Sequence, residues 1–285
     1  MTGAPPFRIR PLAPAIGAEI DNIEVNALSP VMVADLYRAL LTHIVLVFRD
    51  QTLSLEGLKA FARHFGDLSR APYIEPLPEH PEIIRVLKEP DERNISVFGG
   101  EWHSDFSFLA EPPMATVLYA VDVPADRGDT VWANMYAAYD AMPESRLRDL
   151  DRRYAVHSGR PYGTQVTISA SEMSRSIKMT RNDPAAEREQ RHPLVRTHPQ
   201  TGRKALFVNP IYTSRIQGMT DDESRRTLAA LYGHATQPEF TCRLRWRTGT
   251  LAIWDNRCSL HCAINDYDGY RREMLRTMIA GDVPR

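Results

Sequence analysis

Short strand-like runs separated by turns constrain the fold of this chain more strongly than any other feature of its sequence. Apolar and β-branched residues dominate the runs at 83–88, 102–108, 116–123, 194–198, 205–208, 249–254 and 272–279. Proline and glycine mark the turns between them, residues 7–27 have the same character, and the apolar run at 43–48 is typical of a fully buried strand. This pattern predicts a mainly β protein, a sandwich or a barrel, with flanking helices.

Three helices are expected beside these strands. Ser29 precedes a proline and marks the start of the first helix. Ser54 is the expected N-cap of the second helix, which should end at Gly66. The third helix should begin after Thr220, because Glu223 lies three residues later and completes a capping box.

Length, composition and charge bound the class of protein. A chain of 285 residues is compatible with one large domain or two, and contents of 43% hydrophobic and 25% charged residues are ordinary for a soluble globular protein. A formal net charge of −1 gives no electrostatic reason to expect binding of nucleic acid. No segment approaches the roughly 20 apolar residues of a membrane span. The first residues lack a basic region followed by an apolar core, so a cytoplasmic location is expected.

The three cysteines, Cys242, Cys258 and Cys262, are too few and odd in number for a disulfide framework. Cys258 and Cys262 lie close to His261, but their spacing does not fit the common zinc motifs. We therefore expect buried free thiols.

A candidate metal site is formed by two histidines and one carboxylate. His103 and Asp105 are two residues apart in an aromatic stretch, and His261 follows about half a chain later. If 102–108 is a strand, alternation places His103 and Asp105 on one face, and His261 can complete the set from another strand. Such a set leaves one side of the ion open to small molecules, as in non-haem Fe(II) oxygenases. Glu101 falls on the same face, and we expect it to border the substrate cavity.

Two arginines follow on the last predicted strand. Arg272 and Arg276 share a face if 272–279 is extended, with their backbones about 13 Å apart at roughly 3.3 Å per residue. This spacing suits two anionic groups, and a planar guanidinium suits bidentate capture of a carboxylate. Thr130, in the turn at 128–130, can place a hydroxyl beside the same anion.

With these residues in place, the chain resembles the taurine dioxygenase / 2,4-dichlorophenoxyacetate dioxygenase family of Fe(II)- and 2-oxoglutarate-dependent oxygenases. Landmarks in family order lie at 11–20, 45–51, 61–66, 102–105, 128–130, 192–199 and 254–257. The resemblance implies a single domain over 1–285 with the double-stranded β-helix (jelly-roll) fold. It implies an oxidoreductase that uses Fe(II), 2-oxoglutarate and O2, and that releases succinate and CO2 as it hydroxylates its substrate or cleaves a carbon–heteroatom bond. It also implies a homo-oligomer, a dimer or a tetramer.

The same resemblance assigns roles to individual residues. His103, Asp105 and His261 would be the iron ligands. Thr130 and Arg272 would hold the distal carboxylate of 2-oxoglutarate.

The resemblance breaks where the substrate is chosen. In the taurine enzyme a His and a Tyr after the Phe-Gly segment, and an Asn before the metal His, contact the substrate; residues 69–74 and 98–101 lack this polar triplet. Taurine is therefore not the expected substrate. Arg276 would lie near the anionic group of a different small organic anion and near the co-substrate, and Glu101, Tyr73 and Ile74 are the further candidates for substrate contact.

Residues 158–192 form an irregular, charged insertion, and we expect it to be a lid over the active site. Two other functions fit parts of the pattern. A non-catalytic jelly-roll protein that binds a metal or a ligand would have no need to keep Arg272 together with all three metal ligands. A Zn-dependent hydrolase could use the same triad but would have no use for an arginine that binds a dicarboxylate.

Overall fold

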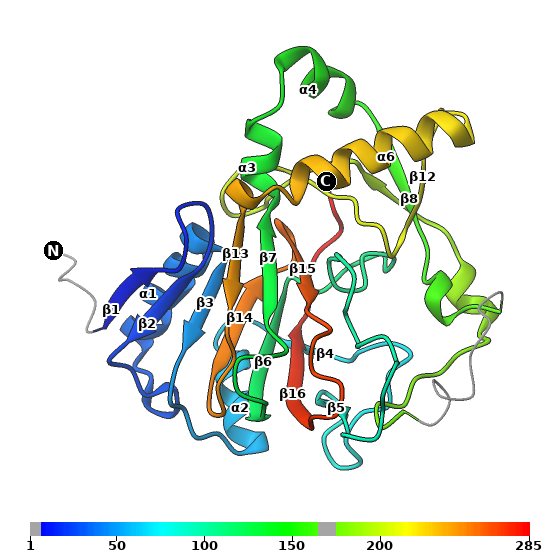
Figure 1. Cartoon of the computed structure of the whole chain (residues 1–285). Coiled ribbons are helices and arrows are strands. Elements are labelled where there is room, and N and C mark those ends of the chain that lie inside the picture. Colours follow the sequence, from blue (N-terminus) through cyan, green and yellow to red (C-terminus); the bar gives the residue numbers. More distant parts are fainter. Residues whose placement is uncertain (1–6, 165–174) are drawn as a thin grey trace, which may run out of the picture.

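A large sheet forms the centre of the computed structural model, which describes residues 7–164 and 175–285 (Figure 1). In this part of the chain the sheet has eight strands in the order β1-β2-β3-β14-β6-β16-β4, and β5 also pairs with β16. Neighbouring strands are antiparallel except β2 and β3, which are parallel. The strands are β1 (Arg8–Pro11), β2 (Ala18–Asp21), β3 (Val45–Phe48), β4 (Leu68–Ser69), β5 (Ile84–Lys88), β6 (Ala115–Asp122), β14 (Leu251–Asp255) and β16 (Arg272–Ile279).

A smaller sheet packs on one face of the large sheet. It consists of β13 (Thr241–Leu244), β7 (Thr130–Asn134) and β15 (Ser259–Ala263), and it lies in front of β14, β6 and β16 in Figure 1. Trp132 of the small sheet and Trp254 of the large sheet are fully buried, with ring centroids 5.6 Å apart. The space between the two sheets is therefore one hydrophobic core.

Helices cover the opposite face of the large sheet. Alternation along β3 sends Val45 and Val47 into the core between the sheets, whereas Leu46 and Phe48 pack with buried residues of α1 (Pro30–His43) and α2 (Leu55–Arg63). The phenyl rings of Phe48 and Phe61 meet edge to face at 5.4 Å. The strand predicted at 43–48 is therefore confirmed over 45–48, where it is buried on both faces, whereas His43 is the last residue of α1 and Ile44 is its C-cap.

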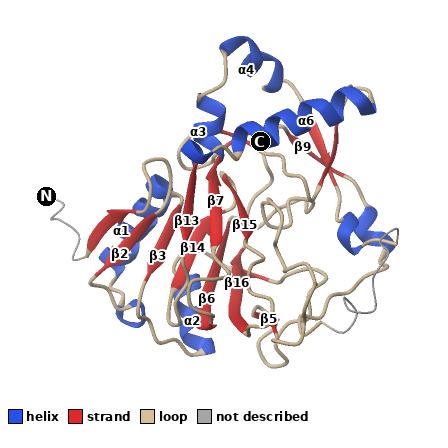
Figure 2. Cartoon of the chain, viewed as in Figure 1, coloured by secondary structure: helices blue, strands red, loops and turns tan. Residues whose placement is uncertain are grey.

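The remaining elements lie beyond one end of the two sheets (Figure 2). Short strands form a three-stranded sheet in the order β12-β8-β9 and a two-stranded sheet, β10-β11. The strands are β8 (Tyr154–His157), β9 (Gln190–Pro193), β10 (Val195–Thr197), β11 (Lys204–Leu206) and β12 (Thr213–Ile216), and the helices are α3 (Met135–Asp140), α4 (Glu144–Leu150) and α6 (Asp221–Ala235). Single 3-10 turns lie at Val25–Ala27, Arg160–Tyr162, Pro184–Glu187 and Pro238–Phe240.

The predicted helix starts are confirmed by their capping hydrogen bonds. The side chain of Ser29 accepts from the Met32 amide, and that of Ser54 accepts from the Gly57 amide. Thr220 and Glu223 form the full capping box of α6. The end of α2 was placed too late, because the helix stops at Arg63 and not at Gly66.

Most predicted strands are present, but the strand predicted at 102–108 is wrong. These residues form a loop with one isolated bridge, between His103 and His261. Phe106 has a positive φ of 44°, which an extended strand does not allow.

In its described parts, 158–164 and 175–192, the insertion carries little regular structure outside its 3-10 turns and β9. Residues 165–174 of the expected lid lie outside the described residues. In the ranges that the structure describes, no helix combines the length and the apolar character needed to cross a membrane.

Candidate active site

The two histidines and the aspartate of the predicted triad meet between the loop at 102–108 and β15. Backbone pairing brings them together: the His103 amide donates to the His261 carbonyl at 3.0 Å, and the His261 amide donates to the His103 carbonyl at 2.8 Å. Asp105 follows in the same loop, so the aspartate is positioned by a turn and not by strand alternation. All three side chains are buried.

The donor atoms of the triad converge on one point. Asp105 Oδ1 lies 3.5 Å from His103 Nε2 and 3.6 Å from His261 Nε2. His103 Nδ1 lies 2.7 Å from the Glu101 carbonyl, and because a carbonyl can only accept, Nδ1 must carry the proton. The lone pair of His103 Nε2 is then left for a metal, the arrangement usual for metal-bound histidine.

The protonation states of the triad also suit a metal. Burial alone would raise the pKa of Asp105, but Arg276 and the two histidines outweigh it and hold that pKa well below its usual range. Burial, reinforced by His103, lowers the pKa of His261 well below its usual value. An anionic carboxylate and a neutral imidazole are the forms that bind metal ions. The residues present therefore fit a divalent ion.

Arg276 forms an ion pair with the aspartate of the triad. Its Nη2 atom lies 2.6 Å from Asp105 Oδ1, and the side chain is buried. The guanidinium also lies over the ring of Phe106, at 5.4 Å from its centroid. Arg276 also lines a cavity beside the triad, and its Nε has no hydrogen-bond partner among the described residues, so its expected place near the anionic group of the substrate stays a prediction.

Arg272 has no such partner, although it lies on the same strand face. It is 4% exposed, its Nη2 donates to the Gly128 carbonyl at 3.1 Å, and its Nε has no hydrogen-bond partner. No carboxylate of the described residues lies within 4.0 Å of its guanidinium, and burial lowers its pKa. An unpaired buried cation is costly, so this position calls for an anionic ligand.

Thr130 lies beside Arg272 in a small cavity that also reaches both histidines of the triad. Its hydroxyl oxygen accepts from the indole N–H of Trp246 at 2.9 Å, which leaves the hydroxyl proton for another acceptor. A guanidinium and a hydroxyl donor thus face the same space next to the triad.

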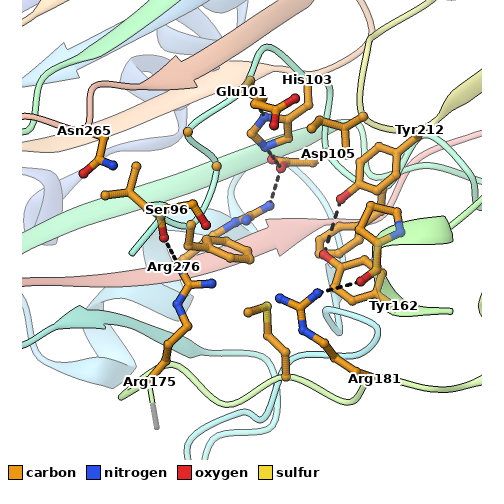
Figure 3. A pocket seen from close by; sticks show the side chains of 18 residues that line it. Ser96, Glu101, His103, Asp105, Tyr162, Arg175, Arg181, Tyr212, Asn265 and Arg276 are labelled. Atoms are coloured by element: carbon orange, nitrogen blue, oxygen red, sulfur yellow. Dashed lines mark hydrogen bonds and ion pairs between the residues drawn. The ribbon is translucent and has the colours of Figure 1, made fainter. Parts of the chain in front are cut away.

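A larger cavity of about 380 Å³ opens on the other side of His103 and Asp105 (Figure 3). Its volume falls in the range of roughly 300–1,000 Å³ that is usual for small-molecule sites. Glu101 borders it, as expected. Its wall also includes Phe98, Phe106, Tyr162, Ile211 and Tyr212.

The other two residues expected to contact the substrate do not line this cavity. The ring of Tyr73 stacks on that of Tyr162 at 5.0 Å, and Ile74 forms a backbone bridge with Met179. Tyr73 and Ile74 therefore lie behind Tyr162 and Met179, which line the cavity.

The sequence interpretation missed Arg175 and Arg181, which line the cavity from within the 158–192 insertion. The signal that could have found them is the alternation Arg175, Ile177, Met179, Arg181. Such a period of two indicates an extended segment with one face turned to a common space.

A second cluster of metal-binding residue types, His198, Asp255 and Cys258, is structural. Asp255 accepts from Arg257 on both oxygens, at 2.9 and 2.6 Å, and from His198 Nε2 at 3.1 Å. His198 Nδ1 accepts from the amides of Gln200 and Thr201. The lone pairs that would bind an ion are therefore already used.

Comparison with known proteins agrees with this geometry. Residues 8–278 match the family described as "Taurine catabolism dioxygenase TauD, TfdA family". An α-ketoglutarate-dependent sulfate ester dioxygenase of Pseudomonas putida is 35% identical over 281 residues, which cover 97% of this chain and 90% of the relative. An α-ketoglutarate-dependent 2,4-dichlorophenoxyacetate dioxygenase of Burkholderia sp. (strain RASC) is 35% identical over 291 residues, which cover 95% of this chain and 93% of the relative.

Solved structures agree as well. The crystal structure of a taurine dioxygenase from Burkholderia xenovorans superposes with a TM-score of 0.82 at 33% identity, and the match covers 98% of this chain and 93% of that one. The chain therefore belongs to the TauD/TfdA dioxygenase family.

Proposed function

We propose that this protein is an Fe(II)- and 2-oxoglutarate-dependent dioxygenase that oxidises a small organic anion other than taurine. The observation that carries the proposal is Arg272, a buried guanidinium without a carboxylate partner among the described residues, beside a triad with the donor set for a divalent metal. When bound, Fe(II), 2-oxoglutarate and O2 supply the oxidising chemistry: one oxygen atom enters the substrate as hydroxyl, the other enters succinate, and the first carbon of 2-oxoglutarate leaves as CO2.

The residues of the site form two neighbouring parts, a metal site and a site for the co-substrate. His103, Asp105 and His261 would hold Fe(II) from one side and leave the other side for small molecules. Arg272 and Thr130 would hold the distal carboxylate of 2-oxoglutarate in the small cavity. The ion pair with Arg276 keeps Asp105 ionised and fixes the position of its Oδ1 atom.

The proposed fold is a double-stranded β-helix, supported by two sheets that face each other across one core. The domain would be single over 1–285, with the described parts of 158–192 forming one wall of the substrate cavity. The homo-oligomeric state and the cytoplasmic location expected from the resemblance stay predictions.

The substrate proposal is supported by the walls of the larger cavity. Its lining includes the aromatic and aliphatic side chains of Phe98, Phe106, Tyr162, Ile211 and Tyr212, which suit an apolar body. The names of the two relatives above refer to a sulfate ester and to 2,4-dichlorophenoxyacetate, both organic anions. Hydroxylation is the simplest outcome, and cleavage follows when the hydroxylated carbon bears a heteroatom.

The triad assignment is tested by anaerobic titration of the purified protein with Fe(II) and 2-oxoglutarate, followed by charge-transfer absorption. His261→Ala should abolish this absorption and leave the far-UV circular dichroism unchanged. His64→Ala replaces an exposed histidine and should behave as wild type. Full absorption in His261→Ala would show that the third ligand is a different residue.

A further inference from the structure

The segment 175–181 contributes three side chains to the lining of the larger cavity. Residues 178–180 run antiparallel to residues 73–75: the Glu75 amide donates to the Lys178 carbonyl at 3.0 Å, and the Thr180 amide donates to the Tyr73 carbonyl at 2.8 Å. This pairing holds 178–180 as extended chain, after a bend at 176–177. Arg175, Met179 and Arg181 line the cavity.

Arg181 has cationic donors that the described residues do not neutralise. Its Nη1 donates to the Pro161 carbonyl at 2.7 Å, and this bond orients the guanidinium toward the cavity, as Figure 3 shows. No carboxylate of the described residues lies within 4.0 Å of it, whereas Arg215, on the same side of the molecule, pairs with Glu189. The planar fork of Arg181 is therefore available for an anion.

The two ends of the cavity differ in chemistry. Figure 3 shows His103 and Asp105 at one end and Arg175 and Arg181 at the other. Arg175 is buried and donates to the Ser96 carbonyl. Between the ends the wall includes the apolar and aromatic side chains of Phe98, Phe106, Met179, Ile211 and Tyr212, together with Arg276.

We propose that Arg181 binds the anionic head of the substrate, with the apolar body lying along the aromatic wall and the oxidised carbon at the triad. This inference rests on the proposed function and deepens it, because it defines the substrate class. The substrate is an amphiphilic carboxylate, sulfonate or sulfate ester in which an apolar body separates the anion from the reacting C–H bond. Arg276, already paired with Asp105, keeps its role beside the metal ligands.

The test uses the Fe(II)-loaded protein with 2-oxoglutarate and three probe anions: octanoate, octyl sulfate and 4-phenylbutanoate. Their neutral counterparts are octanamide, 1-octanol and 4-phenylbutanamide. Anaerobic calorimetry gives Kd for each probe, and succinate release in air gives kcat and KM. The variants are Arg181→Gln, Arg181→Lys and the control Arg188→Gln, which removes an exposed charge from the same insertion outside the cavity lining.

Arg181→Gln should raise Kd and KM at least ten-fold for the anions and leave those of the neutral probes nearly unchanged. Arg181→Lys, which keeps the charge but loses the fork, should give intermediate values and provides the comparison if the Gln variant folds poorly. Arg188→Gln should match wild type. Mass spectrometry of the wild-type product should locate the new hydroxyl at the end of the body remote from the anion.

Three results would overturn the assignment: equal anion affinity in wild type and Arg181→Gln, failure of wild type to bind any of the anions, or hydroxylation next to the anionic group. Each is distinct from a failure of the proposed function. If 2-oxoglutarate is still converted to succinate without substrate, the dioxygenase activity stands and only the role of Arg181 is lost. If no succinate forms under any condition, the proposed function fails as well.

Discussion

Arg272 and Arg276 lie four residues apart on one strand, yet their electrostatic surroundings differ. Arg276 forms an ion pair with Asp105 at 2.6 Å, whereas Arg272 donates to the Gly128 carbonyl, lies over the ring of Tyr267 and has no ion pair within 4.0 Å among the described residues. Sequence alternation predicted that both would share a face, and they do. Alternation could not predict which arginine would form an ion pair, because Asp105 lies in the loop at 102–108. The path of that loop includes the positive φ of Phe106.

Replacing Arg272 with Lys should weaken 2-oxoglutarate binding by at least ten-fold and leave Fe(II) affinity nearly unchanged. The reason is that Lys keeps the charge but cannot offer two parallel donors to one carboxylate. Isothermal titration with each ligand measures both affinities. Arg271→Lys is the matched control, since Arg271 forms its ion pairs on the surface with Glu89, Asp122 and Glu273. An unchanged affinity for 2-oxoglutarate in Arg272→Lys would remove this residue from the co-substrate site.

At the scale of elements, the strand predictions were correct where a partner strand pairs along the predicted run. β16 lies between β5 and β6 and spans 272–279, as its sequence pattern predicted. The loop at 102–108 has one isolated bridge, so its aromatic stretch was mistaken for a strand. Helix starts were predictable because capping is local chemistry, in which a hydroxyl or carboxylate satisfies amides within three residues.

Thr220→Ala should lower the free energy of unfolding by about 1 kcal/mol, because it removes the hydroxyl that accepts from the Glu223 amide at the start of α6. Thr227→Ala makes the same substitution inside that helix, where Ala is the better helix former, and should leave stability equal or slightly higher. Chemical denaturation followed by circular dichroism measures both variants. Equal loss in the two would mean that the cap contributes nothing specific.

At the scale of the whole molecule, two buried histidines join the outer three-stranded sheet to the loop that follows Asp105. His192 Nε2 lies 2.9 Å from the Leu109 carbonyl, and His157 Nδ1 lies 3.0 Å from Ser107 Oγ. No pattern in the sequence marks His157, because its position depends on contacts between segments distant in the chain. Burial, reinforced by His192, lowers the pKa of His157 to about 3, and burial lowers the pKa of His192 to about 4.

These shifts predict a loss of stability in acid. Above the ordinary histidine pKa of 6.5 both states are neutral, and stability is at its full value. As pH falls from 6.5 toward 4, these histidines become protonated in the unfolded chain but stay neutral in the folded protein. The free energy of unfolding then falls by up to about 1.4 kcal/mol per pH unit for each histidine.

Denaturant titrations at several pH values test this dependence. His157→Phe should make the fall in unfolding free energy between pH 6.5 and 4 shallower. His64→Phe, at an exposed histidine, should leave the slope as in wild type. An equally steep slope in His157→Phe would assign the acid sensitivity to other groups.

The paired backbone hydrogen bonds between His103 and His261 also determine how the protein would acquire its ion. Segments this far apart in a chain lose considerable entropy when they are brought together. Here folding of the chain already accounts for this loss of entropy, so the ligands are positioned before the ion binds. In a zinc finger, by contrast, much of the metal's binding free energy is consumed in folding the chain. In this protein we therefore expect the ion to bind and dissociate without loss of the fold.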